Sequence, residues 1–308
     1  MTYDLIIIGG GPAGVSASVY AARKKMKTLL IAPEWGGQSI VSEKIYNWIG
    51  SPSISGAELA LNFKNHAMAN VGEDLQLKEG QKVTNISKKE TNFIVKTDAG
   101  EELETKTILI SSGSGRRKLQ AVGADRLEHK GLTYCASCDG PLFSGQDVVV
   151  IGGGNAGFES AAQLLAYCKS VTLMNRSDTF RADEVTVEKL LKNPKFTVLK
   201  NVETIEVKGE KFVEGLVYKD INTNEEKTLN VTGVFVEIGQ IPNTDFAKDI
   251  VTLDTIGRVK IDPTTQKTST PGIWAAGDCT DVLYHQNNIA AGDAVRALED
   301  IYLALNTK

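Results

Sequence analysis

The sequence predicts an α/β protein made of two parallel-sheet domains, one inserted into the other. Three observations support this prediction. A strand–glycine–helix phrase occurs twice, glycine-rich breakers lie on both sides of the second copy, and the composition suits a packed core. The chain has 308 residues, of which 42% are apolar and 23% charged. This length allows two domains of ordinary size and leaves little for a third.

The first copy of the phrase lies near the start of the chain. Residues 5–8 are all leucine or isoleucine, which indicates a strand buried on both faces. Residues 9–14 then give the spacing Gly-x-Gly-x-x-Gly. A helix is expected over residues 15–24 and a second strand over residues 28–32, which completes a βαβ unit.

The same order returns in the middle of the chain. Residues 148–151 are the apolar run, residues 152–157 repeat the glycine spacing, and a helix over 158–167 and a strand over 171–174 follow. The first glycine allows a tight bend, the second lets a pyrophosphate approach the backbone, and the third lets helix and strand pack. One such motif is weak evidence. Two copies, each between a strand and a helix, favour two Rossmann-like dinucleotide-binding domains over two ordinary glycine-rich turns.

The residues after the second strand of each βαβ unit predict that the two motifs bind different nucleotides, one with a free ribose and one with a 2′-phosphate. Glu34 lies 20 residues beyond the first motif's last glycine, where a carboxylate can accept hydrogen bonds from ribose hydroxyls. The second copy has Ser177 at that distance, with Arg176 and Arg181 beside it, and guanidinium groups suit a 2′-phosphate. We therefore expect FAD or another unphosphorylated ribose at the first motif and NADPH at the second, although Asp178 weakens the second expectation.

A third glycine–acid pair lies near the end of the chain. Residues 273–276 indicate a strand that ends in a turn at Gly277-Asp278. The carboxylate of Asp278 could bind a flavin sugar hydroxyl, or it could cap a helix, since aspartate is a favoured N-cap residue.

The breakers predict the domain organisation. Residues 83–94 and 103–110 indicate strands, and residues 112–115 and 239–243 indicate linkers. We expect an inserted domain over residues 116–241 that carries the second motif. Residues 1–115 and 242–308 would then form one discontinuous domain.

Charge and composition exclude several classes of protein. Lysine and arginine number 34 against 38 acidic residues, a formal net charge of −4, which excludes a generally basic nucleic-acid binder. Residues 5–22 are uncharged, but their glycines rule out one uniformly apolar helix, and the preceding Asp4 does not suit a signal peptide. We expect a cytoplasmic protein that enters no membrane.

Two of the four cysteines form a Cys-x-x-Cys pair, Cys135 and Cys138. Such pairs are redox-labile, and no second pair or nearby histidine completes a metal site. Cys168 and Cys279 are interpreted as small core residues. Asp139 follows the pair and could protonate a leaving thiolate or belong to the turn Asp-Gly-Pro, two compatible roles.

These phrases carry a resemblance to a known family. The segments "CASCDGPLF" from Cys135, "IGGGNAG", "FVEIGQIPNT" and "AAGDCTDVLYHQ", together with Gly36-Gly37-Gln38, occur in order over essentially the whole chain. The chain resembles the small flavoprotein thioredoxin reductases, and still more closely the reductase part of the alkyl hydroperoxide reductase flavoprotein subunit. The larger glutathione-reductase-type enzymes fit worse, because they place their cysteines earlier and add a C-terminal interface domain.

The resemblance implies a homodimer with FAD and NAD(P)H domains joined by two hinges, in which Cys138 faces the flavin and Cys135 attacks the partner's disulfide. The partner would be a thioredoxin- or glutaredoxin-like protein, and Asp139 would be the acid. With the first motif, the expected FAD-binding residues are Gly9, Gly11, Pro12, Ala13, Gly14, Glu34, Gly37, Gln38, Asn47, Val83, Gly113, Gly277, Asp278 and Gln286. With the second motif, the expected pyridine-nucleotide residues are Gly152, Gly154, Asn155, Ala156, Gly157, Glu159, Arg176 and Arg181.

The chain departs from the family at three points. Thioredoxin reductases usually carry His-Arg-Arg-x-x-x-Arg for the 2′-phosphate, whereas this chain has Asn175-Arg176-Ser177 and then Arg181. The peroxide-reductase flavoprotein usually has an acid at position 175 and prefers NADH. It also carries an N-terminal thioredoxin-like domain, whereas this chain starts at the first flavin strand.

Four other functions compete with a thioredoxin reductase. They are an NADH-dependent reductase of a peroxiredoxin system, a ferredoxin-driven reductase, a dithiol oxidase and a non-catalytic nucleotide sensor. The intact motif at residues 152–157 disfavours the ferredoxin-driven reductase and the oxidase, and the Cys-x-x-Cys pair disfavours the sensor.

Overall fold

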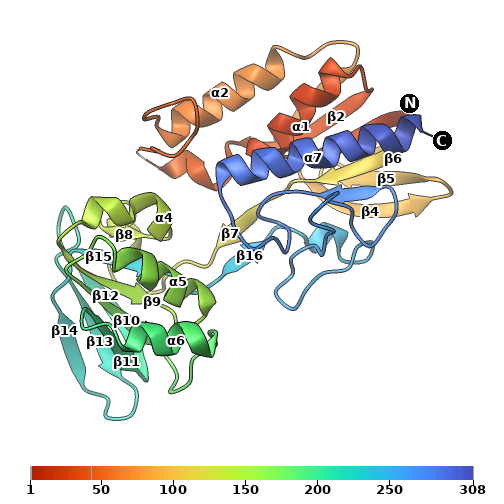
Figure 1. Ribbon diagram of the computed structural model, residues 1–308. Coiled ribbons are helices and arrows are strands. Elements are labelled where there is room, and N and C mark those ends of the chain that lie inside the picture. The colour runs from red at the N-terminus through yellow and green to blue at the C-terminus, as the bar shows by residue number, and fades with distance from the viewer. Residues whose placement is uncertain (1, 43, 308) are drawn as a thin grey trace. The chain divides into compact units, whose positions relative to one another are not determined.

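The computed structural model describes residues 2–42 and 44–307, and its chain divides into two compact units (Figure 1). One unit is Met1–Gly115 with Ile241–Lys308, and the other is Arg116–Gln240. From the sequence we expected the inserted domain to end at residue 241, one residue later than in the structure. The chain crosses between the units in two short strands that pair with each other, β7 (Ser114–Arg116) and β16 (Gln240–Pro242).

The discontinuous unit is built on a seven-stranded sheet with the path β3-β2-β1-β6-β5-β4, in which β17 also pairs with β6. Strands β1, β2, β3, β6 and β17 are parallel, while β4 and β5 form an antiparallel hairpin on β6. The strands are β1 (Thr2–Gly10), β2 (Thr28–Trp35), β3 (Leu75–Glu79), β4 (Val83–Lys89), β5 (Asn92–Thr97), β6 (Glu102–Ile110) and β17 (Ile273–Ala275).

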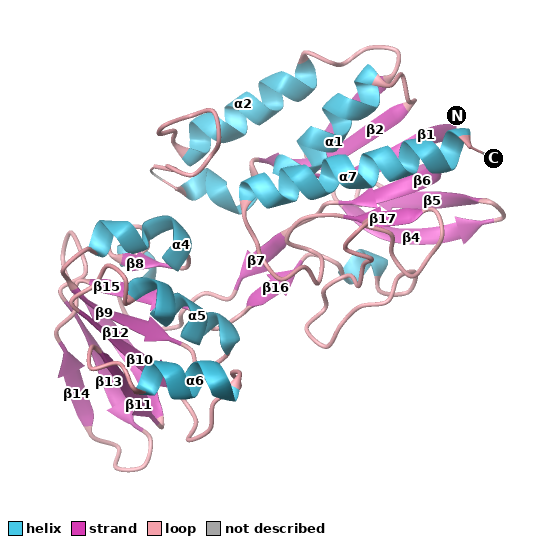
Figure 2. Cartoon of the chain, viewed as in Figure 1, coloured by secondary structure: helices cyan, strands magenta, loops and turns pink. Residues whose placement is uncertain are grey.

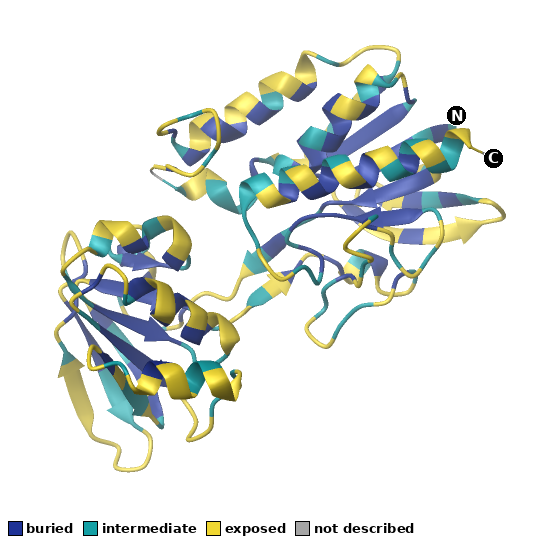
Figure 3. Ribbon diagram, viewed as in Figure 1, coloured by how far each residue is buried: buried dark blue, intermediate teal, exposed yellow. Residues whose placement is uncertain are grey.

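Strand β1 is buried on both faces, as its apolar run predicts. Leu5 and Ile7 belong to the hydrophobic cluster on one face, and Ile6 and Ile8 belong to the cluster on the other. This alternation follows from the two-residue period of a strand. Figure 3 shows the resulting buried strands beneath helices that are exposed along one side.

Three longer helices belong to this unit: α1 (Pro12–Arg23), α2 (Gly56–Met68) and α7 (Asn287–Asn306). They pack on one face of the sheet, where Val15, Phe63 and Leu298 share one cluster (Figure 2). Ser55 caps α2, because its Oγ accepts a hydrogen bond of 3.1 Å from the amide of Glu58. Short 3-10 helices lie at Gly37–Val41 and Asp245–Ala247.

The single strand predicted over residues 83–94 is wrong. The segment is a hairpin in which β4 ends at Lys89 and β5 begins at Asn92. Glu90 makes the turn with a φ of 53°, a left-handed conformation that glycine usually supplies. Residues 86–91 contain no glycine, proline or asparagine, so the local sequence does not mark the turn.

The inserted unit contains a five-stranded parallel sheet in the order β11-β10-β9-β15-β8. Its strands are β8 (Leu132–Thr133), β9 (Asp147–Ile151), β10 (Ser170–Asn175), β11 (Phe196–Lys200) and β15 (Gly233–Val236). Four helices accompany it: α3 (Ala124–Leu127), α4 (Ala136–Asp139), α5 (Asn155–Leu164) and α6 (Glu184–Leu191), with a 3-10 helix at Gly140–Phe143.

A three-stranded antiparallel sheet, β12-β13-β14, completes the inserted unit. Its strands are β12 (Val202–Lys208), β13 (Gly215–Asp220) and β14 (Glu226–Leu229). Val207 and Leu216 from this sheet join Val149 of β9 in one buried cluster. The α/β architecture with two dinucleotide-type βαβ units is thereby confirmed.

Both helices after the glycine motifs start three residues earlier than the sequence suggested, at Pro12 and Asn155. The last residues of each motif therefore form the first helical turn. Across the described ranges, every helix is too short or too polar to cross a membrane.

Candidate functional site

The two glycine turns have the same geometry in both units. Gly9 and Gly152, which begin the two motifs, have φ values of 121° and 132°. A Cβ on Gly14 would lie 1.8 Å from the carbonyl oxygen of Gly9, and one on Gly157 would lie 1.9 Å from that of Gly152. The third glycine of each motif is therefore required for the helix to pack on the turn.

The middle glycine of each motif borders open space instead. A Cβ on Gly11 or Gly154 would meet nothing within 4 Å. Both residues are the N-caps of their helices, and neither helix receives a side-chain cap. The N-termini of α1 and α5 thus lack a side-chain cap and border open space, which is the arrangement that binds a pyrophosphate in dinucleotide folds. The residues that supply those first turns are Pro12, Ala13, Asn155 and Ala156.

Glu34 lies near the carboxyl end of β2, where its side chain is exposed. Its carbonyl oxygen would be 2.4 Å from a Cβ on Gly10, so the strand end is packed against the first glycine turn. This packing places an exposed carboxylate beside the motif, as ribose binding needs.

Three segments that lie far apart in the sequence meet around Gln38. Its Nε2 donates hydrogen bonds to Ser114 Oγ at 2.9 Å and to Asp278 Oδ2 at 3.4 Å. Its Oε1 is buried and has no hydrogen-bond partner among the described residues. The amide therefore holds an unused acceptor that a polar group of a ligand can satisfy.

A second set of contacts joins residues 39–47 to residues 286–288. Asn47 Nδ2 donates to Gln286 Oε1 at 3.1 Å, and Asn288 Nδ2 donates to the Asn47 carbonyl at 2.7 Å. Ser39 and Asn287 also bond to each other through their side chains. Two of the expected flavin residues, Asn47 and Gln286, are thus direct neighbours.

Asp278 does not cap a helix. The next helix, α7, has Gln286 as its N-cap, and Asp278 instead contacts Gln38 and His285, whose Nδ1 lies 3.5 Å from Asp278 Oδ1. Gly277, like Gly37 and Gly113, has a positive φ, between 61° and 78°, which glycine adopts without strain.

Val83 is not brought to these residues by any contact that the described part of the chain shows. It opens β4 at the end of the sheet path, and its side chain is buried in the cluster that contains Ile86 and Phe93.

In the inserted unit, the loop after β10 folds back onto the second glycine turn. The Arg181 amide donates to the Gly153 carbonyl at 2.9 Å. The loop is closed by Asn175, whose Nδ2 donates to the carbonyls of Ser177 and Thr179, each at 2.8 Å. An aspartate in this place could not make these bonds, because a carboxylate only accepts hydrogen bonds.

Both arginines of this loop, Arg176 and Arg181, are exposed. The side chain of Arg176 is 80% exposed, and its Nη2 lies 3.4 Å from Glu203 Oε1. Asp178, which the sequence suggested as a competing acid, is not the residue that pairs with it. Glu159 is also exposed, on the first turns of α5. An exposed guanidinium binds an anion more weakly than a buried one, since solvent screens it.

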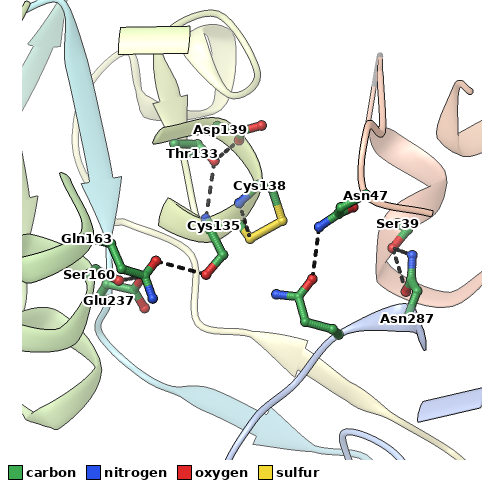
Figure 4. The surroundings of a disulfide bond; sticks show 12 residues. Ser39, Asn47, Thr133, Cys135, Cys138, Asp139, Ser160, Gln163, Glu237 and Asn287 are labelled. Atoms are coloured by element: carbon green, nitrogen blue, oxygen red, sulfur yellow. Dashed lines mark hydrogen bonds between the residues drawn. A yellow bond between two sulfur atoms is a disulfide. The ribbon is translucent and has the colours of Figure 1, made fainter. Parts of the chain in front are cut away.

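Cys135 and Cys138 form a disulfide with a Cα–Cα distance of 5.3 Å (Figure 4). Cys135 is the N-cap of the short helix α4, and its Sγ accepts a hydrogen bond of 3.2 Å from the Cys138 amide. Cys135 is half-buried, whereas Cys138 is exposed. External groups can therefore reach this disulfide at one end, as redox exchange requires.

Asp139 lies directly behind the disulfide at the end of α4. Its carboxylate accepts a hydrogen bond from the hydroxyl of Thr133, and the same hydroxyl accepts one of 3.2 Å from the Cys135 amide. Thr133 therefore links the acid to the first cysteine. Sequence reasoning missed this residue, because nothing in its spacing marks it.

The remaining cysteines are confirmed as core residues. Cys168 is 1% exposed and Cys279 is fully buried. Burial raises the pKa of each thiol to about 11. Neither provides a thiolate near neutral pH.

Sequence reasoning also missed Glu237, the first residue after β15. Ser160 of α5 donates a hydrogen bond of 2.6 Å to its Oε1, and burial raises the pKa of Glu237 to about 7. Within residues 2–42 and 44–307, no three His, Cys, Asp or Glu residues gather as a metal site would require.

The model of one protein family matches residues 3–296, and its description is pyridine nucleotide-disulphide oxidoreductase. A Bacillus subtilis (strain 168) protein named NADH dehydrogenase is 38% identical over 295 residues. A Staphylococcus epidermidis protein named as a component of alkyl hydroperoxide reductase is 39% identical over the same length. Each alignment covers 96% of this chain but 57% of the relative, so the chain spans little more than half the length of these curated relatives.

A solved structure matches over its full length. The thioredoxin reductase from Streptococcus pyogenes MGAS5005 superposes with a TM-score of 0.90 and 31% sequence identity, covering 100% of this chain and 99% of that one.

Proposed function

The chain belongs to the pyridine nucleotide-disulphide oxidoreductase family, and from this premise we propose that it is a thioredoxin reductase. In this proposal it takes electrons from NADPH through FAD and the Cys135–Cys138 disulfide. It passes them to the disulfide of a thioredoxin- or glutaredoxin-like protein.

One observation carries the proposal. The disulfide of Cys135 and Cys138 lies in the same unit as a complete Gly-x-Gly-x-x-Gly turn. The other unit holds the first such turn, at residues 9–14, together with the Gln38, Asp278 and Asn47 contacts. A dithiol and two dinucleotide sites are the parts that a disulfide reductase needs.

The glycine turns fit the two cofactors. The open space at Gly11 would take the pyrophosphate of FAD, and that at Gly154 the pyrophosphate of the pyridine nucleotide. When bound, these groups supply two-electron chemistry, in which hydride passes from the nicotinamide to the flavin and an electron pair passes on to the disulfide. Glu34 would accept hydrogen bonds from the adenosine ribose of FAD, and the free acceptor of Gln38 would meet a donor of the flavin.

The cysteines then transfer the electron pair by thiol–disulfide exchange. The Cys135 thiolate attacks a sulfur of the partner's disulfide and displaces the other partner sulfur as a thiolate. Cys138 then attacks Cys135, which restores the protein's own disulfide and releases the reduced partner. Asp139, whose carboxylate accepts the hydrogen bond of Thr133, would donate a proton to a leaving thiolate.

A second candidate is an NADH-dependent reductase of a peroxiredoxin system. It is favoured by the pairing of Arg176 with Glu203, which occupies one of the two arginines available for a 2′-phosphate. The relative from Staphylococcus epidermidis, named for alkyl hydroperoxide reductase, also favours it. We retain NADPH as the proposed donor because the loop presents two arginines and Asn175 takes the place of a ribose-binding acid.

We further propose that the protein is a homodimer of the cytoplasm. Family resemblance supports both statements. Sedimentation of the purified protein at micromolar concentration should give twice the 33.2 kDa of one chain.

Stepwise anaerobic reduction tests the proposed function. The purified protein should be yellow, release FAD rather than FMN, and bleach when NADPH is added. Oxidised thioredoxin should then restore the colour with one disulfide reduced per FAD. A protein that NADPH does not bleach would favour the ferredoxin-driven reductase or the oxidase instead. Bleaching by NADH alone, with electrons passed only to a peroxiredoxin-system protein, would establish the second candidate.

A further inference from the structure

Glu237 is built into the second glycine turn. Its amide donates a hydrogen bond of 2.8 Å to the carbonyl of Ile151, the last residue of β9. A Cβ on Gly152 would lie 2.2 Å from the carbonyl oxygen of Glu237 and 3.5 Å from its Cβ. Glu237 therefore follows the last residue of β15 and lies directly beside the turn at the end of β9.

This place is where the strand order of the inserted sheet reverses. From β9 the chain proceeds to β10 and β11 on one side, while β15 and β8 lie on the other. In open parallel sheets, ligands bind at the carboxyl ends of the strands on either side of such a reversal. Glu237 is the acid at that end of β15.

The side chain of Glu237 is held in place. Ser160, which is buried on α5, donates its hydroxyl to Glu237 Oε1 at 2.6 Å. Helix α5 is also the helix whose N-terminus follows Gly154. Glu237 thus contacts the glycine turn through its backbone and the helix through its carboxyl, and this turn and helix would together bind a pyrophosphate.

The charge state of this carboxyl changes near neutral pH. Burial raises the pKa of Glu237 to about 7. The Ser160 hydrogen bond and the charge of Arg116 act in the opposite direction, and the charge of Glu159 acts with burial. These are the neighbouring groups, on α5 and β7, that set its ionisation.

We propose that Glu237 makes pyridine-nucleotide binding depend on pH, because the nucleotide binds tightly when this carboxyl is neutral and weakly when it is ionised. The inference rests on the proposed nucleotide site in the inserted unit. It adds a proton-binding residue to that site.

The direction follows from charge. A pyrophosphate is a dianion at neutral pH, and an ionised carboxylate at the same end of the sheet repels it. The bound anion in turn favours the protonated carboxyl, so binding near pH 7 takes up a proton from solution. We expect the affinity to fall roughly three- to tenfold between pH 6 and pH 8.5.

Binding of ADP-ribose and of 2′-phospho-ADP-ribose to the FAD-loaded protein tests this inference. Neither compound can transfer hydride, and ADP-ribose has no 2′-phosphate that titrates in this range. Calorimetry in two buffers of different ionisation enthalpy counts the protons taken up. The wild type should take up a fraction of a proton at pH 7 and show the expected fall in affinity.

Three variants make the test specific. Glu237→Gln should abolish the proton uptake and bind at pH 8.5 as tightly as at pH 6. Ser160→Ala should move the midpoint of the pH profile upward, because it removes a hydrogen bond that lowers the pKa of Glu237. Glu214→Gln removes one negative charge from an exposed position of the same unit and should match the wild type.

The outcomes separate this inference from the proposed function. Binding with the same pH profile in the wild type and Glu237→Gln, together with an unmoved midpoint in Ser160→Ala, overturns the inference and leaves the nucleotide site intact. No binding of either compound, or of NADPH, at any pH overturns both. If Glu237→Gln does not fold, the shift in Ser160→Ala decides the question.

Discussion

Among single residues, the four cysteines divide into two chemical classes. Cys138 is exposed in a disulfide with Cys135, while Cys168 and Cys279 are buried thiols. The Cys-x-x-Cys spacing predicted the first class, and Cys168 and Cys279, which lie outside that spacing, were interpreted as small core residues. Reactivity follows from this burial, since a thiol with a raised pKa is not a nucleophile at neutral pH.

We therefore expect Cys135→Ser and Cys138→Ser each to reduce turnover with oxidised thioredoxin to background. Both variants should still bleach with NADPH, because the dithiol accepts electrons only after the flavin. Stopped-flow absorbance separates the two steps. Cys168→Ser serves as the control and should retain wild-type turnover. A Cys138→Ser protein that reduces thioredoxin normally would contradict the assignment.

The arginines that follow β10 decide the choice of nucleotide. A charge-assisted hydrogen bond contributes roughly 1.5–3 kcal/mol, and exposure lowers this contribution. Arg176→Ala and Arg181→Ala should each raise the Michaelis constant for NADPH, by about tenfold or less, and leave that for NADH little changed. Glu203→Gln should lower the constant for NADPH a few-fold, because it frees Arg176. Equal efficiency with both nucleotides in the wild type would show that the arginines do not bind the 2′-phosphate.

The sequence identified the residues of the motifs but not the hydrogen bonds that they make with residues far away in the chain. Gln38 and Asp278 are 240 positions apart, and Ser160 and Glu237 are 77 apart. Their contacts depend on which strands lie side by side, and that order cannot be read from local spacing. Thr133 was missed for a related reason, because a threonine before a cysteine has no special pattern.

Among the helices and strands, the two βαβ units followed directly from apolar runs and glycine spacing. The element ends were less predictable. The hairpin at β4 and β5 was interpreted as one strand because its turn has Glu90 in a conformation that the sequence does not mark. The helices α1 and α5 begin inside the motifs, since the residues between the second and third glycines already adopt helical geometry.

The second and third glycines of a motif should respond differently to the same substitution. Gly157→Ala places a Cβ 1.9 Å from the Gly152 carbonyl oxygen, so the turn must move, at a cost of about 1–3 kcal/mol in the free energy of unfolding. Gly154→Ala places a Cβ in open space and should cost about 1 kcal/mol or less. The same Gly154→Ala should weaken NADPH binding at least about tenfold, because the methyl group occupies the space of the pyrophosphate.

Thermal unfolding and calorimetric titration measure the two effects on these variants. FAD content is the internal control, since both substitutions lie in the inserted unit. In the other unit, Gly11→Ala should mainly weaken FAD binding, and Gly14→Ala should mainly lower the free energy of unfolding. A Gly154→Ala protein with wild-type affinity for NADPH would mean that the open space at α5 is not the nucleotide site.

Across the whole molecule, the two units have separate hydrophobic cores. Each of the four buried hydrophobic clusters draws its residues from only one unit. The discontinuous unit is closed by its C-terminal segment, because Leu298 and Ile301 of α7 pack in the same cluster as Val15 and Val19 of α1. Glycine-rich breakers located the two crossings in the sequence to within one residue of the observed division.

Removal of the inserted unit should therefore leave the other unit folded. A Cβ on Gly115 would lie 3.8 Å from the Ile241 carbonyl oxygen, so the cut ends are close enough for a linker of a few glycine and serine residues. Closing so short a loop costs little chain entropy. The protein lacking residues 116–240 should be monodisperse, bind FAD and be yellow. It should not bleach with NADPH or reduce thioredoxin, since the second glycine turn and both redox cysteines are gone.

The isolated unit of residues 116–240 should fold and bind 2′-phospho-ADP-ribose without any flavin. Absorbance spectra and titrations of the two fragments check these expectations. A colourless or aggregated first fragment would mean that the FAD unit depends on the inserted one for its fold.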